Sequence, residues 1–133
     1  MMVFLDANPV IYLIEQPANL GSKVTARVSD LLASGERLAV SDLVRMECQV
    51  GPLKANDAEL LARYATFFSS PDLDVLPVSP AVCDRAARIR AQYGFKPLDS
   101  LHLAAAVEHG CTRFLCNDAQ LKWFPDILVE ILS

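Results

Sequence analysis

The feature that most constrains the fold is an alternation of short apolar segments with longer segments of helical periodicity. Segments of strand character lie at residues 2–5, 37–41, 72–79, 112–118 and 126–132. Helical segments start at Pro9 and also cover about 20–33, 42–50, 56–68, 80–93 and 97–110. Strands that alternate with helices form a mainly parallel sheet covered on both faces. We therefore expect residues 1–133 to form a single three-layer α/β/α domain around a sheet of four or five strands.

Local signals suggest where several helices begin and end. Asn8 precedes Pro9, and this order is typical of a helix cap followed by the first helical position. Asn56 with Glu59 resembles a capping box for the helix at 56–68. The pair at 51–52, Gly-Pro, predicts the end of the helix that begins at residue 42.

The composition excludes several classes of protein. Hydrophobic residues make up 53% of the chain, so extended disorder is not expected. No apolar run reaches the roughly 18 residues of a membrane span, and we expect no membrane association. The net charge of −4 argues against strong nonspecific binding of nucleic acid, but it does not exclude an enzyme that acts on one. We expect a cytoplasmic protein.

The four cysteines follow no metal-binding pattern. Cys48, Cys83, Cys111 and Cys116 lack CxxC spacing, and in an intracellular protein we expect them to be buried thiols. A zinc site built from the two histidines with Cys111 and Cys116 would have spacings that match no common zinc motif.

Four acidic residues lie where the predicted elements begin or end. Asp6 and Asp118 directly follow predicted strands, whereas Glu47 and Asp99 lie near the starts of helices. Three of them have a simpler interpretation: Asp99 could interact favourably with the helix dipole, Asp118 could cap a short helix, and Glu47 could be exposed. Asp6 could also be a helix cap, but we expect Asn8 to fill that role. Because the carboxyl ends of parallel strands share one edge of the sheet, we expect the four to meet there.

Four carboxylates in one cleft repel one another, and nothing obvious in the sequence supplies four buried arginines or lysines to compensate them. A hard divalent cation would relieve this repulsion, and oxygen ligands favour Mg²⁺ or Mn²⁺ over zinc. Such an ion can orient a water molecule and neutralise charge that builds up on a phosphate. The pattern therefore predicts phosphodiester hydrolysis.

At this point the sequence resembles the PIN-domain nucleases, and more narrowly the VapC toxins of type II toxin–antitoxin pairs. The resemblance rests on four segments in the order of the family: VFLDANPVIYLIE (3–15), SDLVRMECQVGPL (41–53), FKPLDSLHLAAAVEHG (95–110) and FLCNDAQL (114–121). Together they span nearly the whole chain.

The resemblance implies a role for each matching residue. Asp6 and Asp99 would be the most direct metal ligands, and Glu47 and Asp118 would complete the site. Three polar residues would hold these carboxylates in place: Asn8, Ser41 and Asn117. Cys116 departs from the family, which commonly has Thr or Ser there; a thiol is a weak hydrogen-bond partner for a carboxylate.

The resemblance also implies an activity and partners. The chain would be an endoribonuclease that uses one or two Mg²⁺ or Mn²⁺ ions and leaves 5′-phosphate and 3′-hydroxyl ends. A cognate antitoxin protein of the VapB type would inhibit it, and it would form a homodimer, for which the apolar surfaces of 42–50 and 56–68 are suitable. No histidine is required as a base, and we interpret His102 as a packing or dimer residue.

Two other functions stay open, and a third fits the sequence poorly. A housekeeping RNA-processing nuclease of the PIN family would share the same residues, and a noncatalytic PIN-like module would bind RNA or a partner without cleavage. A phosphotransfer domain is disfavoured: haloacid-type phosphatases need D-x-D after the first strand, and position 8 is Asn.

Overall fold

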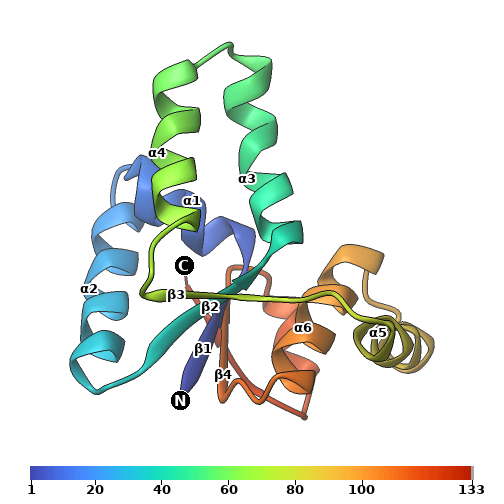
Figure 1. Cartoon of the computed structure of the whole chain (residues 1–133). Helices are drawn as coiled ribbons and strands as arrows, with labels where there is room; N and C mark the ends of the chain where they lie inside the picture. The colour runs from blue at the N-terminus through green and yellow to red at the C-terminus, as the bar shows by residue number, and fades with distance from the viewer. Residues whose placement is uncertain (133) are drawn as a thin grey trace.

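A five-stranded, fully parallel sheet runs through the middle of the molecule (Figure 1). The computed structural model describes residues 1–132. The strand order is β3-β2-β1-β4-β5. The strands are β1 (Met2–Leu5), β2 (Arg37–Ser41), β3 (Leu73–Leu76), β4 (Arg113–Cys116) and β5 (Leu128–Ile131).

Helices cover both faces of this sheet. The first four helices are α1 (Ala7–Glu15), α2 (Leu20–Ala33), α3 (Asp42–Lys54) and α4 (Ala58–Phe68). They lie on one side, and α5 (Pro80–Tyr93) and α6 (Pro97–Glu108) lie on the other (Figure 1). A short 3₁₀ helix, η1 (Ala119–Trp123), connects β4 to β5. The expected three-layer α/β/α architecture is confirmed. The sheet has five strands, all of them parallel.

The core explains why the central strands are continuous apolar runs. Val3, Phe4 and Leu5 of β1 are fully buried because helices cover both faces of the strand. Phe4 stacks on Phe114 of β4 with 5.2 Å between ring centroids. This packing fixes the ends of β1 and β4 against each other, and both strands lead directly into polar residues.

The first helix begins two residues earlier than the sequence suggested. Asp6, not Asn8, is the N-cap of α1, and the Ala7 amide donates to Asp6 Oδ1 at 2.8 Å. Pro9 fits inside the first turn because amides in that turn have no intrahelical acceptor. The prediction that Asn8 caps this helix is wrong.

The boundary between α3 and α4 also differs from the prediction. Helix α3 continues through Pro52 to Lys54. Pro52 removes only the helical bond of its own missing amide, and its fixed φ is compatible with a helix that ends two residues later. Asn56 has a left-handed backbone with φ 51°, which Asn adopts more readily than most residues. The cap of α4 is Asp57, whose carboxylate accepts from the Leu60 amide at 3.0 Å.

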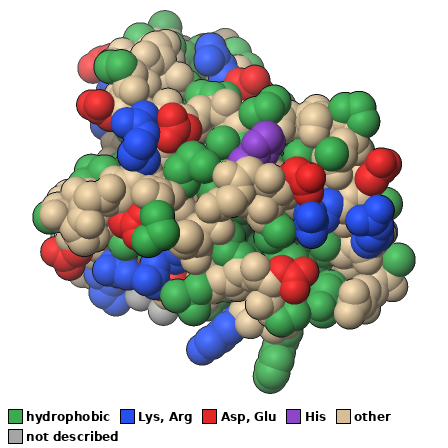
Figure 2. Space-filling model, turned by 60° about the horizontal axis from the view of Figure 1, so that its bottom comes forward, with side chains coloured by type: hydrophobic (Ala, Val, Ile, Leu, Met, Phe, Trp, Pro, Cys, Tyr) green, Lys and Arg blue, Asp and Glu red, His purple; other side chains and the backbone are tan. Residues whose placement is uncertain are grey.

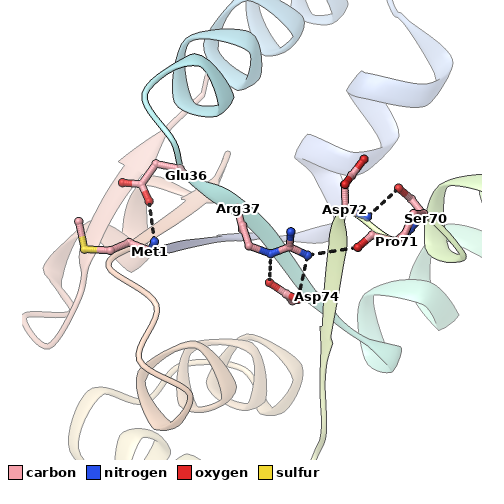
Figure 3. A network of polar contacts seen from close by, with 7 residues as sticks. All are labelled: Met1, Glu36, Arg37, Ser70, Pro71, Asp72 and Asp74. Atoms are coloured by element: carbon pink, nitrogen blue, oxygen red, sulfur yellow. Dashed lines mark hydrogen bonds and ion pairs between the residues drawn. The ribbon is translucent and has the colours of Figure 1, made fainter.

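Ionic contacts connect the amino-terminal parts of β2 and β3 (Figure 3). Arg37 donates to both carboxylate oxygens of Asp74, at 2.8 and 3.1 Å, and to the Pro71 carbonyl at 3.3 Å. The terminal amine of Met1 lies 3.9 Å from Glu36 Oε2. In this part of the sheet, basic groups pair with acidic ones.

The surface shows the same mixture of charges. On the face drawn in Figure 2, acidic and basic side chains are interspersed with hydrophobic ones. Within residues 1–132, no helix has both the length and the apolar character needed to cross a membrane.

Candidate active site

The candidate site lies where the order of the strands reverses. The chain proceeds from β1 to β2 and β3 on one side, then returns through α5 and α6 to β4 on the other. Leu5 is in register with Leu115, and the Asp6 amide donates to the Leu115 carbonyl at 3.0 Å. In parallel α/β sheets, the crevice at such a switch point is the usual ligand site.

A cleft of about 560 Å³ opens at this point. Its lining includes the four acids that the sequence suggested: Asp6, Glu47, Asp99 and Asp118. Lys96 is the one cationic side chain among the described residues that line it. The structure thus brings carboxylates from four separate segments into one predominantly acidic cleft.

Asp6 is the most buried of the four acids, with 7% of its surface exposed. Burial raises the pKa of Asp6 to about 6, and the negative charges of Glu47 and Asp99 add to this effect. His102 and the hydrogen bond from the Ala7 amide act in the opposite direction, but they do not cancel it. The cap role and the cleft position are compatible, since the Ala7 amide bonds to Oδ1 alone.

Glu47 extends from the middle of α3 to a buried histidine. His102 Nε2 lies 2.6 Å from Glu47 Oε1 and 3.6 Å from Asp6 Oδ1. One potential ligand atom from each of these three residues lies within 4.8 Å of the other two. These three residues could together hold a metal ion, and they include one, His102, that the sequence analysis did not assign to the site.

The interpretation of His102 as a packing or dimer residue is therefore incomplete. It does pack: its side chain is fully buried and its ring lies 5.8 Å from that of Phe4. A fully buried ring cannot form a dimer contact, and it has a polar partner in Glu47. The sequence contained a signal, because Asp99 and His102 are three residues apart and share one face of α6.

Asp99 occupies the first turn of α6, where an acid favourably meets the helix dipole. Even so, the pKa of Asp99 is raised. Burial is the largest cause, the negative charge of Asp118 is the next, and Glu47 makes a smaller contribution. His102 and Lys96 oppose the shift. The helix dipole alone therefore does not explain why an acid is at this position.

Asp118 caps η1 by accepting a hydrogen bond from the Gln120 amide at 2.9 Å. The capping role considered from the sequence is thus present. Cys116 is fully buried, and its thiol lies 3.7 Å from the backbone carbonyl of Asp118. Burial raises the pKa of Cys116 to about 12, which keeps it a neutral, weak donor. The thiol contacts the backbone of the acid and not its carboxylate.

The three polar residues predicted to hold the carboxylates form no hydrogen bond with a carboxylate among residues 1–132. Asn8 donates to the Asn117 side-chain oxygen at 2.7 Å, and Asn117 donates to the Tyr12 hydroxyl at 2.7 Å. These two residues line the cleft but bond to each other. Ser41 is fully buried, and its hydroxyl has no hydrogen-bond partner within residues 1–132. Ser41 therefore forms no hydrogen bond with a carboxylate among these residues, and its supporting role stays a prediction.

The donor set fits a hard divalent cation. Four carboxylates line a cleft that has one lysine, and the pKa values of Asp6 and Asp99 are raised. Both observations describe negative charge that the protein does not neutralise. Oxygen-rich sites of this kind suit Mg²⁺ or Mn²⁺.

Comparisons with known proteins agree with this architecture. The family model described as "PIN domain" matches residues 3–126. A comparison with curated protein sequences finds no match.

Solved structures share the fold over most or all of their length. A chain of VapBC2 from Rickettsia felis, bound to a promoter DNA fragment, has a TM-score of 0.80 at 21% identity, with 100% of each chain covered. A toxin–antitoxin complex from Klebsiella pneumoniae gives 0.77 at 20% identity, covering 98% of each chain. VapC20 from Mycobacterium tuberculosis, described as a toxin that cleaves the sarcin–ricin loop, gives 0.68 at 15% identity, covering 84% of this chain and 86% of that one. At these identities the likeness shows a common fold.

Proposed function

The chain belongs to the PIN-domain family, and we propose that it is a divalent-metal-dependent endoribonuclease. One observation carries the proposal: four carboxylates from separate segments line the cleft at the switch point, with a single lysine beside them. A fold that needed only stability would pair or disperse these charges, since each unpaired acid in a cleft costs free energy.

The four acidic residues of the cleft have different roles in this proposal. Asp6 and Asp99 would hold a divalent cation most directly, and Glu47 and Asp118 would complete its surroundings. A divalent cation at this position would neutralise charge on a phosphate and make water a better nucleophile. Mg²⁺ and Mn²⁺ both fit the oxygen donors, as one ion or two.

The chain's own groups position the substrate and move the proton. Glu47 is partly exposed and lines the cleft, so one of its oxygens can accept the proton of the attacking water. Lys96 lines the same cleft and provides a positive charge for a non-bridging phosphate oxygen. Attack by water from outside the RNA leaves a 5′-phosphate and a 3′-hydroxyl.

We further propose that the chain is the toxin of a VapBC-type pair. The support is a fold shared over the full length with chains of known toxin–antitoxin complexes. The partner would be an antitoxin protein that inserts a cationic side chain into the acidic cleft. We place the protein in the cytoplasm, in keeping with four cysteines that form no disulfide.

A homodimer is part of this proposal. Met46, Val50 and Leu53 of α3 are exposed and recur at helical spacing. An apolar stripe of this kind on the α3–α4 pair suits a second copy of the chain.

The test is cleavage of labelled RNA by the purified chain, free of any partner protein. We expect cleavage with Mg²⁺ or Mn²⁺, none with a chelator, and products with 5′-phosphate and 3′-hydroxyl ends. Asp6→Ala and Asp99→Ala should be inactive, whereas Asp74→Asn, which changes an acid outside the cleft, should cleave normally. Equal cleavage with a chelator would contradict the metal requirement. A metal-loaded wild type that binds RNA without cutting it would favour a noncatalytic module.

A further inference from the structure

We propose that His102 is a positioning residue that fixes the Glu47 carboxylate in the cleft through a hydrogen bond from Nε2. The inference rests on the proposed function, because it concerns how the same site is prepared for a cation. In this role His102 supports Glu47, a ligand of the cation, and does not itself coordinate the cation.

The first step concerns which atom carries a proton. Glu47 Oε1 lies 2.6 Å from His102 Nε2, a distance typical of a strong, charge-assisted hydrogen bond. An ionised carboxylate can only accept, and two acceptors would repel at this distance, so we assign the proton to Nε2 and the donor role to His102. Nε2 thus carries a proton whether the imidazole is neutral or charged, and its lone pair is not free to bind a metal.

The second step concerns what holds the ring. His102 is fully buried, and its Nδ1 has no hydrogen-bond partner among residues 1–132. Its orientation therefore comes from packing, including the tilted contact with Phe4. Burying Nδ1 without a hydrogen-bond partner costs free energy. The hydrogen bond from Nε2 to Glu47 is the polar contact that His102 provides in return.

The third step concerns geometry. His102 belongs to α6 and Glu47 to α3, which lie on opposite faces of the sheet (Figure 1). Their bond joins the two helical layers across the carboxyl edge of the sheet, beside Asp6 at 3.6 Å. Without it, Glu47 is a partly exposed side chain with several rotatable bonds and would be drawn to solvent. A rigid partner removes that freedom before any cation arrives.

The experiment compares two variants of His102 whose amide side chains differ in length by one methylene group. The side-chain nitrogen of His102→Gln can take the place of Nε2, whereas that of His102→Asn falls short of Glu47. Binding of Mn²⁺ to each variant is measured by calorimetry, and thermal unfolding is measured in parallel. We expect His102→Asn to bind Mn²⁺ about tenfold or more weakly and His102→Gln to bind within about threefold of wild type. A merely structural role would lower the stability of both variants without separating their affinities.

Two spectroscopic readouts do not depend on activity. In the metal-free protein, the nitrogen NMR signals of His102 should show a proton on Nε2 that shifts in Glu47→Gln; a proton on Nδ1 alone would overturn the proposal. In the Mn²⁺-loaded protein, pulsed electron paramagnetic resonance should show no directly coordinated nitrogen. A coordinated nitrogen would make His102 a ligand and overturn the positioning role.

The possible outcomes distinguish a failure of this inference from a failure of the proposed endoribonuclease function. A wild type that binds Mn²⁺ and cleaves RNA, with His102→Asn equal to it in affinity, contradicts the inference alone. A wild type that binds no divalent cation contradicts the proposed function and removes the purpose assigned to His102.

Discussion

The acids of the outer strands and those that follow the central strands have opposite surroundings. Asp74 on β3 and Glu130 on β5 each bond to an arginine, Arg37 and Arg27 respectively, and the pKa of each carboxyl is lowered by that hydrogen bond. Asp6, directly after β1, has no arginine partner among the described residues, and burial raises its pKa to about 6. The outer acids are neutralised within the fold, and the central ones are not.

This difference separates stability from function. Paired acids contribute to the fold when ionised, whereas Asp6 and Asp99 oppose it when ionised, because burial and their neighbours disfavour the charge. An arrangement that costs stability in the free protein is expected where a ligand supplies the missing charge. Changing one acid from each region should therefore have opposite consequences for activity and stability.

The largest expected effect is on cleavage. Asp6→Asn removes a negative charge from the cleft but keeps an oxygen that can cap α1. We expect RNA cleavage to fall by at least about 100-fold, comparable to the loss of one preorganised electrostatic group. The measurement is the initial rate with saturating Mg²⁺. A rate within threefold of wild type would show that Asp6 is not part of the site.

The second effect concerns stability and pH in the metal-free protein. The folded-state pKa of Asp6, about 6, is above its ordinary value of 3.8, so the folded state binds more protons than the unfolded state between these values. The free energy of unfolding should therefore fall as the pH rises from about 4 to above 6, by at most about 3 kcal/mol for a shift of about 2 units.

Chemical denaturation of the metal-free protein across this pH range measures the effect. Asp6→Asn should flatten the profile and be the more stable protein at pH 8, and added Mg²⁺ should restore the stability of the wild type. A wild-type stability that rises with pH through this window would mean that Asp6 is stabilised by its surroundings.

A smaller and opposite effect is expected at β5. Glu130 accepts from Arg27 at 2.6 and 2.9 Å and from Arg113 at 2.7 Å. Glu130→Gln leaves two partly buried guanidinium groups with a neutral partner, and we expect a loss of about 1–2 kcal/mol in unfolding free energy. Cleavage by the folded variant should equal that of wild type. A large loss of activity with unchanged stability would break the distinction between the two regions.

The smallest effect is expected at β3. Arg37 and Asp74 form a bidentate pair, but their side chains are 46% and 35% exposed. Solvent weakens such pairs, so Asp74→Asn should cost no more than about 1 kcal/mol, and less at high salt. Urea unfolding at two salt concentrations measures this effect, and a loss above 2 kcal/mol would mean that the pair is more than a surface contact.

The sequence predicted the layers and the location of the cleft. Both follow from the hydrophobic periodicity of the segments and from the order of strands and helices along the chain. Strands β1 and β2 and helix α2 have the predicted bounds, since apolar runs and a terminal glycine mark them clearly. Helix caps were harder to place: Asp6 and Asn8, or Asn56 and Asp57, are similar capping residues one or two positions apart. Only the backbone geometry decides between them.

The detailed contacts of the site could not be read from the sequence. The hydrogen bond between His102 and Glu47 joins residues 55 positions apart, and its length depends on how α3 and α6 pack. The bond between Asn8 and Asn117 joins residues 109 positions apart. In the sequence, each of these polar residues has a local interpretation that is equally reasonable. Their true partners follow from tertiary structure alone.

The most direct test of the account is a calorimetric titration of Mn²⁺ into the metal-free protein at neutral pH, with wild type, Asp6→Asn and Asp74→Asn in parallel. The account predicts saturable binding by wild type and Asp74→Asn and its loss in Asp6→Asn, because only Asp6 lies in the unneutralised cleft. Equal binding by all three proteins would contradict it.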